Sequence, residues 1–187
     1  MIRRLRYQVA MSLDGFIAGV EGAYDWIVMD EAIDFTSLFA NFDTAVMGRR
    51  TFEVLAAQEG NGELPGLDVV VFSRTLPSAT RPHVRIVNDD PVDVVRDLKA
   101  RPGRDIWLYG GGQLFRVLLD AGLVDSVEVA VMPVLLGSGV PLLPAGAMRT
   151  LTLVDHKILR GSGLAVLSYA VKGSAASGVQ INYVSES

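Results

Sequence analysis

Short apolar segments alternate with amphipathic ones along this chain, and that alternation limits the folds open to its 187 residues. Segments 5–10, 44–47, 84–87 and 105–109 have the length and composition of strands. Segment 68–73 contains Val-Val-Val-Phe, which is apolar toward both faces, as in strands buried within a parallel sheet. Strands separated by helices predict a mostly parallel central sheet covered by those helices.

The segments between these strands carry helix signals. Apolar spacing predicts helices over residues 30–39, 51–57, 91–100 and 113–121. The third helix has the clearest start, because an Asp-Pro pair supplies an N-cap side chain and then a residue suited to the first turn.

The pattern becomes strand-rich after residue 126. A strand with valines at alternate positions precedes a Gly- and Pro-rich excursion over residues 134–144. Segments 151–159 and 164–171 then predict an antiparallel closing hairpin. We therefore expect an α/β fold whose mostly parallel sheet ends in an antiparallel C-terminal hairpin.

We expect residues 1–172 to form a single domain, because no linker or repeat interrupts them. Segment 173–187 begins Gly-Ser-Ala-Ala-Ser-Gly, a composition typical of a flexible or partner-contacting tail. Residues 179–184 alternate weakly between apolar and polar, so this part of the tail has the pattern of a pairing strand.

Composition excludes several classes of function. The chain has no cysteine, which rules out disulfides, thiolate catalysis and cysteine-bound metals. Its two histidines, His83 and His156, lie far apart in sequence, so we expect no metal site. The net charge of −4 argues against nucleic-acid binding. We expect no signal peptide, membrane span or membrane partner, and the simplest location is the cytoplasm.

Three predicted junctions between a strand and the segment after it have residues suited to phosphate. In the first, Gly48, Arg49, Arg50 and Thr51 begin a helix, whose free N–H groups and positive dipole favour an anion. The alternative is a simple turn in which Thr51 caps the helix and the arginines are solvated. In the second, Ser73 and Arg74 follow the most apolar strand, either as phosphate ligands or as a polar loop.

The third junction is Gly110-Gly111-Gly112-Gln113-Leu114. Three successive glycines have a high conformational entropy cost, which suggests that the backbone must pass close to another group there. The motif does not match the dinucleotide-binding Gly-x-Gly-x-x-Gly pattern, and no Walker lysine follows it. A sharp structural turn is the alternative.

Taken together and in order, these motifs resemble the dihydrofolate reductase superfamily, and within it the reductase domain of riboflavin biosynthesis. The resemblance implies a three-layer, dihydrofolate-reductase-like fold, NADPH as cofactor, a small-molecule substrate and a homodimer. It covers most of the chain, and the segments that carry it are 9–18, 47–52, 71–74, 109–114, 123–125 and 133–142.

The resemblance also implies roles for single residues. The Gly48–Thr51 group would hold the pyrophosphate and the 2′-phosphate, and Ser73 with Arg74 would flank the 2′-phosphate. Gly111 and Gly112 would form a tight peptide link, with a cis geometry as one option. Ala10 and loop 14–19 would border the nicotinamide.

The proton donor stays open at this point. Folate-reducing members carry one acid on the helix after the first loop. Counting from Trp26 leads to Glu31, whereas counting back from Gly48 leads to Ala32. Asp30 and Asp34 therefore remain candidates beside Glu31, and Asp30 has an alternative role as a helix N-cap.

Asp14 is another candidate acid, because riboflavin-type reductases share its Ser-Leu-Asp-Gly motif; the alternative is an Asp-Gly turn. Those enzymes also place basic residues after the Gly-x-x-Thr motif, to meet the ribose phosphate of the substrate. Here segment 53–60 holds no positive charge, which puts a phosphorylated ribityl substrate in doubt.

We therefore predict an NADPH-dependent reductase acting on a pyrimidine- or pteridine-like substrate, resembling 5-amino-6-(5-phosphoribosylamino)uracil reductase. Three alternatives stay open: a true dihydrofolate reductase, a nucleotide-binding module without turnover, and a structural protein that dimerises through its hairpin and tail. Turnover of dihydrofolate would identify the first alternative. Tight NADPH binding without oxidation would identify the second, and a lack of nucleotide binding the third.

Overall fold

The computed structural model describes residues 3–59, 61–77 and 80–172. The predicted tail, 173–187, lies outside the described residues, so the expectations for it and for its alternating part stay predictions. None of the described helices is long and apolar enough to cross a lipid bilayer.

Short strands and four α-helices make up the described chain, with one 3₁₀ turn, η1 (Val20–Gly22). The strands are β1 (Leu5–Ser12), β2 (Phe16–Ala18), β3 (Phe42–Gly48), β4 (Asp68–Phe72), β5 (Thr80–Arg81), β6 (Val84–Val87), β7 (Asp105–Gly110), β8 (Ser126–Met132), β9 (Val140–Pro141), β10 (Leu151–Leu159) and β11 (Leu164–Val171). The helices are α1 (Phe35–Phe39), α2 (Arg49–Glu59), α3 (Pro91–Ala100) and α4 (Gly112–Asp120).

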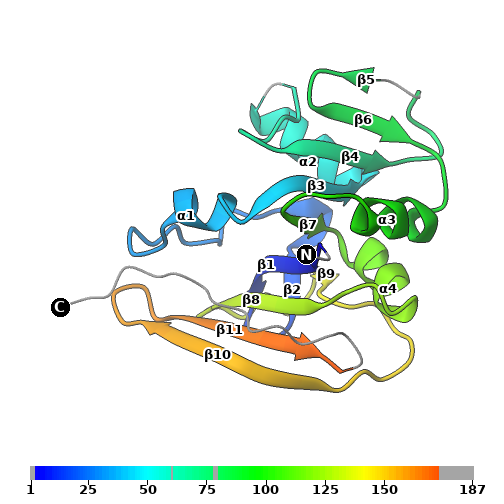
Figure 1. Cartoon of the computed structure of the whole chain (residues 1–187). Coiled ribbons are helices and arrows are strands. Elements are labelled where there is room, and N and C mark those ends of the chain that lie inside the picture. The colour runs from blue at the N-terminus through cyan, green and yellow to red at the C-terminus, as the bar shows by residue number, and fades with distance from the viewer. Residues whose placement is uncertain (1–2, 60, 78–79, 173–187) are drawn as a thin grey trace.

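One large sheet runs through the molecule (Figure 1). Within the described residues its order is β10-β11-β8-β1-β7-β3-β4-β6-β5. The six strands from β8 to β6 are parallel neighbours, while β11, β10 and β5 pair antiparallel. The mostly parallel sheet and the closing hairpin are thus confirmed.

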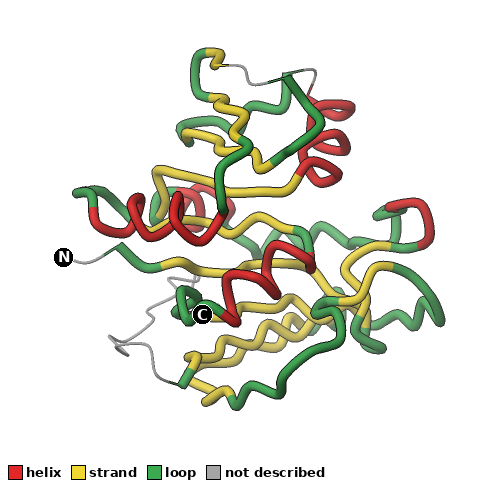
Figure 2. Tube along the Cα trace, turned by 90° about the vertical axis from the view of Figure 1, so that its right-hand side faces the viewer, coloured by secondary structure: helices red, strands yellow, loops and turns green. Residues whose placement is uncertain are grey.

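Helices cover both faces of this sheet and give three layers. On one face, α3 and α4 bury Val95, Leu98 and Leu118 against the apolar side chains of β1, β3, β4 and β7. On the other, α2 buries Phe52 and Leu55 against β3, β4 and β7. Figure 1 shows α1 on one side of the sheet and α3 with α4 on the other, and Figure 2 gives the same layers from the side.

The helix predicted over residues 30–39 is shorter than expected. The helix α1 begins only at Phe35, and its N-cap is Asp34, whose carboxylate accepts from the Ser37 amide at 3.0 Å. The alternative of Asp30 as helix cap is wrong, because its carboxylate instead accepts from the Ala32 amide at 2.9 Å within a turn. The local hydrogen bond of Asp30 offers the backbone an alternative to helix, so α1 begins later than predicted.

Two further pairings were not expected from the sequence. The segment after β1 and the Gly- and Pro-rich excursion form a small second sheet in which β2 pairs antiparallel with β9. The short strand β5 pairs with β6 at the outer edge. Both strands of the second sheet are too short for an alternating pattern to reveal them.

A buried ion pair anchors β1 to β8. The guanidinium of Arg6 donates to both carboxylate oxygens of Glu128 at 2.8 Å, and the two residues are 2% and 4% exposed. The hydroxyl of Ser126 also donates to Glu128, at 2.9 Å. Burial alone would lower the pKa of Arg6, but Glu128 and Asp105 raise it above its ordinary value. The guanidinium of Arg6 therefore stays charged inside the protein.

We predict that Glu128→Ala destabilises the fold strongly, because Arg6 stays buried, loses both hydrogen bonds to Glu128 and keeps the longer contact with Asp105 at 3.4 Å. The free energy of unfolding should fall by about 3–5 kcal/mol in urea denaturation. The control is Asp93→Ala, which removes the exposed ion pair with Arg96 and should cost less than about 1 kcal/mol. Equal losses in the two variants would contradict the anchoring role.

Candidate functional site

The three predicted junctions come to one edge of the sheet. Strands β7, β3 and β4 are parallel neighbours, so their carboxyl ends lie side by side. In the register, Met47 pairs with Gly110 and Gly48 pairs with Phe72, the residue before Ser73. Open parallel sheets bind ligands beyond this edge. The segments after β3, β4 and β7 therefore lie next to one another at the carboxyl edge of the sheet.

The glycine triplet lies against the start of α2. A Cβ built on Gly110 or Gly111 would lie 3.7 Å or 3.4 Å from the side chain of Thr51. Gly110 has a φ of 143°, which a side chain would disfavour. The peptide bond between Gly110 and Gly111 is cis, one residue earlier than the Gly111–Gly112 link expected from the resemblance. The triplet and Thr51 thus face each other across a narrow gap.

The first turn of α2 presents positive charge to the same region. Arg49 and Arg50 are both exposed, and the Arg49 guanidinium donates to Glu53 at 2.9 Å, one helical turn away. A Cβ built on Gly48 would meet no atom within 4 Å, so the space in front of this residue is open. Free N–H groups at a helix start and nearby guanidinium groups are suited to bind an anion.

Ser73 is buried and bonded within its own turn, whereas Arg74 is exposed. Ser73 is 7% exposed, and its hydroxyl oxygen accepts from the amides of Thr75 and Leu76 at 3.2 and 2.9 Å. The Ser73 hydroxyl therefore shapes the turn after β4. Arg74, at the corner of that turn, is exposed and lies at the same edge as Arg49.

The start of α4 is held against the excursion that follows β8. A Cβ on Gly112 would come within 2.7 Å of the Pro141 carbonyl oxygen, so only glycine allows this approach. Gln113 is exposed, whereas Leu114 is buried in the core. The side chain of Leu114 is thus turned away from the edge, and only its backbone is available to a ligand.

Ala10 lies where β1 continues beyond the end of β7. Tyr7 pairs with Leu108, so β1 extends past Gly110 and Ala10 pairs only with Ala130 of β8. Ala10 packs against a buried cluster of Met132, Leu159 and Leu164, and Trp26 of loop 26–33 packs against the same cluster. Ala10 thus lies on β1 just beyond the level of Gly110, on the side of the cluster that loop 26–33 also covers.

Asp14 joins two loops. Its Oδ1 accepts from the Ser12 hydroxyl at 2.6 Å and from the Leu136 amide at 3.1 Å, and its Oδ2 accepts from the Gly137 amide at 2.7 Å. The Ser12 hydroxyl, together with the amides of Gly137 and Leu136, lowers the pKa of Asp14. A carboxylate bound in this way is ionised at neutral pH and has no proton to give.

The other candidate acids are also poor proton donors. The carboxylate of Asp34 caps α1, and the hydroxyl and amide of Ser37 lower its pKa. The pKa of Asp30 is lowered by Ser162 and by the amide of Ala32. Glu31 is exposed. Asp14, Asp30 and Asp34 therefore all have a lowered pKa, which is unfavourable for a proton donor.

Sequence reasoning missed the partners of Asp14. They lie in the excursion 134–144, where Leu13 donates to the Val134 carbonyl at 2.9 Å and Leu142 to the Gly15 carbonyl at 2.9 Å. Gly137 and Gly139, both with positive φ, were the available signal for a tight loop. In the part of the chain that the structure describes, no group of three His, Asp or Glu side chains gathers as a metal site.

The family model described as the RibD C-terminal domain matches residues 3–164. The chain belongs to the RibD C-terminal domain family. The uncharacterised protein YyaP of Bacillus subtilis is 36% identical over 151 residues, which are 75% of this chain and 80% of YyaP. The riboflavin biosynthesis protein RibD of Mycobacterium tuberculosis is 31% identical over 152 residues, 72% of this chain and 43% of that longer protein.

Solved structures agree with this RibD C-terminal domain assignment. A putative riboflavin biosynthesis protein from Shewanella has a TM-score of 0.76 at 27% identity, covering 90% of this chain and 99% of its own. Dihydrofolate reductase from Enterococcus faecalis, solved with NADP(H), has a TM-score of 0.67 at 17% identity, covering 90% and 96%. The fold is therefore dihydrofolate-reductase-like, as predicted.

We predict that Asp14→Ala loosens the joined loops without unfolding the sheet. Amide hydrogen exchange at residues 136 and 137 should become faster, because both amides lose their acceptor, while Asp25→Ala on the exposed loop surface leaves it unchanged. Unchanged exchange in the Asp14 variant would contradict the role of Asp14.

The same contact should depend on pH in a defined direction. Because the folded pKa of Asp14 is lowered, its stabilising effect is complete above the ordinary value of 3.8 and is lost as the pH falls through the folded pKa. The difference in melting temperature between the parent protein and Asp14→Ala should therefore be present at pH 7 and shrink below pH 3.8. A difference that grows in acid would contradict this assignment.

Proposed function

We propose that this member of the RibD C-terminal domain family is an NADPH-dependent reductase that transfers hydride to a C=N or C=O group of a pyrimidine- or pteridine-like substrate. The observation that carries the proposal is the meeting of Arg49, Arg74 and the glycine triplet at one edge of a parallel sheet. That edge combines positive charge with a backbone free of side chains, as a phosphorylated dinucleotide requires.

The residues at this edge fit such a cofactor. The absence of side chains at Gly110 and Gly111 leaves a narrow gap beside the hydroxyl of Thr51, which a Cβ would fill. The open space before Gly48 lies next to the first turn of α2. We propose that Gly48, Arg49 and Thr51 hold the pyrophosphate.

Arg74 is our choice for the residue that distinguishes NADPH from NADH. It is exposed at the corner after β4. Strand β4 ends beside the end of β3, where α2 begins. Ser73 is largely committed to the turn, so the guanidinium is the stronger candidate for the 2′-phosphate. Arg50, exposed beside Arg49, would add a second positive charge.

The cofactor, when bound, would supply the hydride, and the chain would supply position and shielding. Ala10 and the joined loops around Asp14 would border the reacting carbon and limit access of water. The low pKa values of Asp14 and Asp34 favour water as the source of the proton. Most of the rate would then come from orientation of the two reactants.

The substrate of riboflavin-type enzymes carries a ribose phosphate, and the substrate of this protein would lack it. Arg49 forms an ion pair with Glu53, and segment 53–60 holds no basic residue. An acidic helix face is a poor site for a ribose phosphate. We therefore propose a pyrimidine- or pteridine-like ring that carries no phosphate at this position.

We predict that Arg74→Gln raises the Kd for NADPH by about tenfold to a hundredfold, because one or two charge-assisted hydrogen bonds to the 2′-phosphate are lost. The Kd for NADH should stay the same, because NADH has no 2′-phosphate. Arg101→Gln, an exposed arginine just after α3 and far from this edge, is the matched control. Fluorescence titration measures all three proteins, and equal affinity of the parent for both cofactors would overturn the assignment.

We also predict that the parent protein oxidises NADPH in the presence of an unphosphorylated aminouracil or pterin, followed by absorbance at about 340 nm. Asp34→Asn should keep turnover within about threefold, because Asp34 caps a helix and donates no proton in this account. Turnover that requires Asp34 would instead favour a folate-type mechanism. Tight NADPH binding with no oxidation across the panel would favour a binding module.

A further inference from the structure

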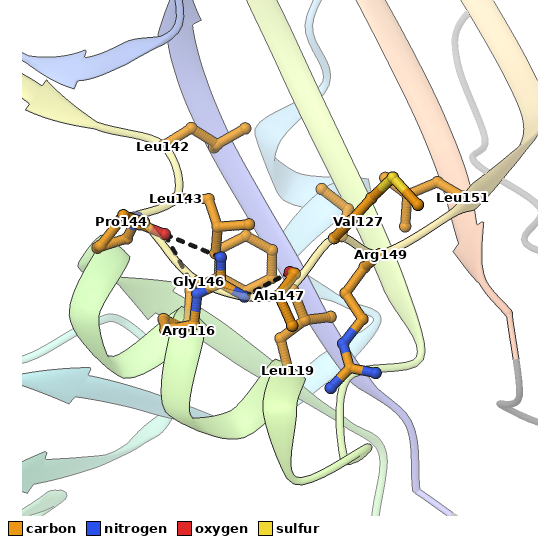
Figure 3. Close-up of a pocket in the computed structure, with 13 residues that line it drawn as sticks. Arg116, Leu119, Val127, Leu142, Leu143, Pro144, Gly146, Ala147, Arg149 and Leu151 are labelled. Carbon is orange, nitrogen blue, oxygen red and sulfur yellow. Dashed lines mark hydrogen bonds between the residues drawn. The ribbon is translucent and has the colours of Figure 1, made fainter.

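A hollow lies between α4 and the segment that leads into β10 (Figure 3). It has a volume of about 330 Å³, and its floor is apolar, with Leu119 and Val127 each 3% exposed. Met148 at its rim is 90% exposed. An apolar hollow of this size with an exposed methionine has room for an apolar side chain.

Arg116 holds the hollow open. Its guanidinium donates to the Pro144 carbonyl at 2.9 Å and to the Ala147 carbonyl at 3.0 Å, shown as dashed lines in Figure 3. These bonds fix segment 144–147 above α4, so the space is part of the fold and does not depend on a ligand to shape it.

The described chain ends beside this hollow. Val171 at the end of β11 pairs with Leu151, which lines the hollow, and the tail 173–187 follows directly. Residues 173–178 span at most about 20 Å. After them come Val179, Ile181 and Tyr183, apolar at alternate positions. The apolar part of the tail can therefore reach the hollow from the same molecule.

Charge at the rim matches the end of the tail. Arg149 is 41% exposed and shares the Asp120 carboxylate with Arg116. Two guanidinium groups around one carboxylate leave a net positive rim. Glu186 follows the apolar stretch of the tail by two residues and has the opposite charge.

We propose that the hollow between α4 and segment 142–149 is the docking site for the tail of the same chain, with Ile181 seated on the apolar floor and Glu186 near Arg149. Docking would add apolar contacts to segment 144–147, which Arg116 already holds above α4. Leu142 and Pro144 line the hollow and also lie against Gly112, so an occupied hollow would support the start of α4.

A pair of introduced cysteines tests this directly, since the chain has none of its own. In the full-length protein, Met148→Cys with Ile181→Cys should form a disulfide within one molecule under mild oxidation. The control pairs Ile181→Cys with Gln58→Cys, an exposed position on α2 at the opposite face of the sheet. Non-reducing electrophoresis at several protein concentrations separates monomer from dimer.

Faster cross-linking of the first pair than of the control, within a monomer, is the expected result. A disulfide-linked dimer would mean that the tail of a second copy occupies the hollow, and equal rates for the two pairs would mean that no tail docks there. Either result overturns the proposal. The test needs no nucleotide, so it is independent of the proposed reductase activity.

Hydrogen exchange gives a second measurement. Ile181→Asp should speed amide exchange over residues 145–149, because a carboxylate cannot enter the apolar floor. Asn182→Asp adds the same charge at the neighbouring position and should leave exchange as in the parent. Exchange that is identical in the two variants would contradict docking through Ile181.

Discussion

Parallel pairing of β1, β7, β3 and β4 is the constraint on which the proposed chemistry depends. It brings Gly110, Gly48 and Ser73, which lie far apart in the sequence, to a single edge. The pairing is secured on the other side of β1 by the buried contact between Arg6 and Glu128. Because each charge is inside the protein, that contact resists any shift of β1 against β8, and a register shift would move Ala10 away from the glycine triplet.

Hydrogen bonds and close backbone approaches join the loops around the edge. The carboxylate of Asp14, the short pairing of β2 with β9 and the contact of Gly112 with Pro141 join three segments that are distant in the chain. A site built in this way is pre-organised before a ligand arrives. It also explains why an acid in a reductase-like motif has a structural role in this chain.

Much of the fold could be predicted from sequence because local signals agreed with the tertiary structure. Asp90 and Pro91 began α3 as expected, and the alternating segments of the closing hairpin gave β10 and β11 with their observed bounds. The start of α1 could not be predicted, since Asp30 and Asp34 are equally good caps in sequence and only packing decides between them. The site was predictable as a set of junctions, because parallel strands place their ends together.

The partners of single side chains were beyond the sequence. No local sequence pattern predicts that the amide of Gly137 donates to Asp14, or that the Ser73 hydroxyl accepts from the amide of Leu76. These contacts depend on loop geometry that distant residues set. The glycine triplet is an intermediate case. Its unusual backbone was expected, but the cis peptide is at Gly110–Gly111, one residue before the expected link.

Hydrogen exchange with and without NADPH can show whether one edge of the sheet holds a phosphorylated dinucleotide. We expect slower exchange in three separate segments, 48–52, 73–76 and 110–113, and no change at the opposite edge, over residues 101–105 and 122–126. Protection confined to one of the three segments, or equal at both edges, would contradict the account.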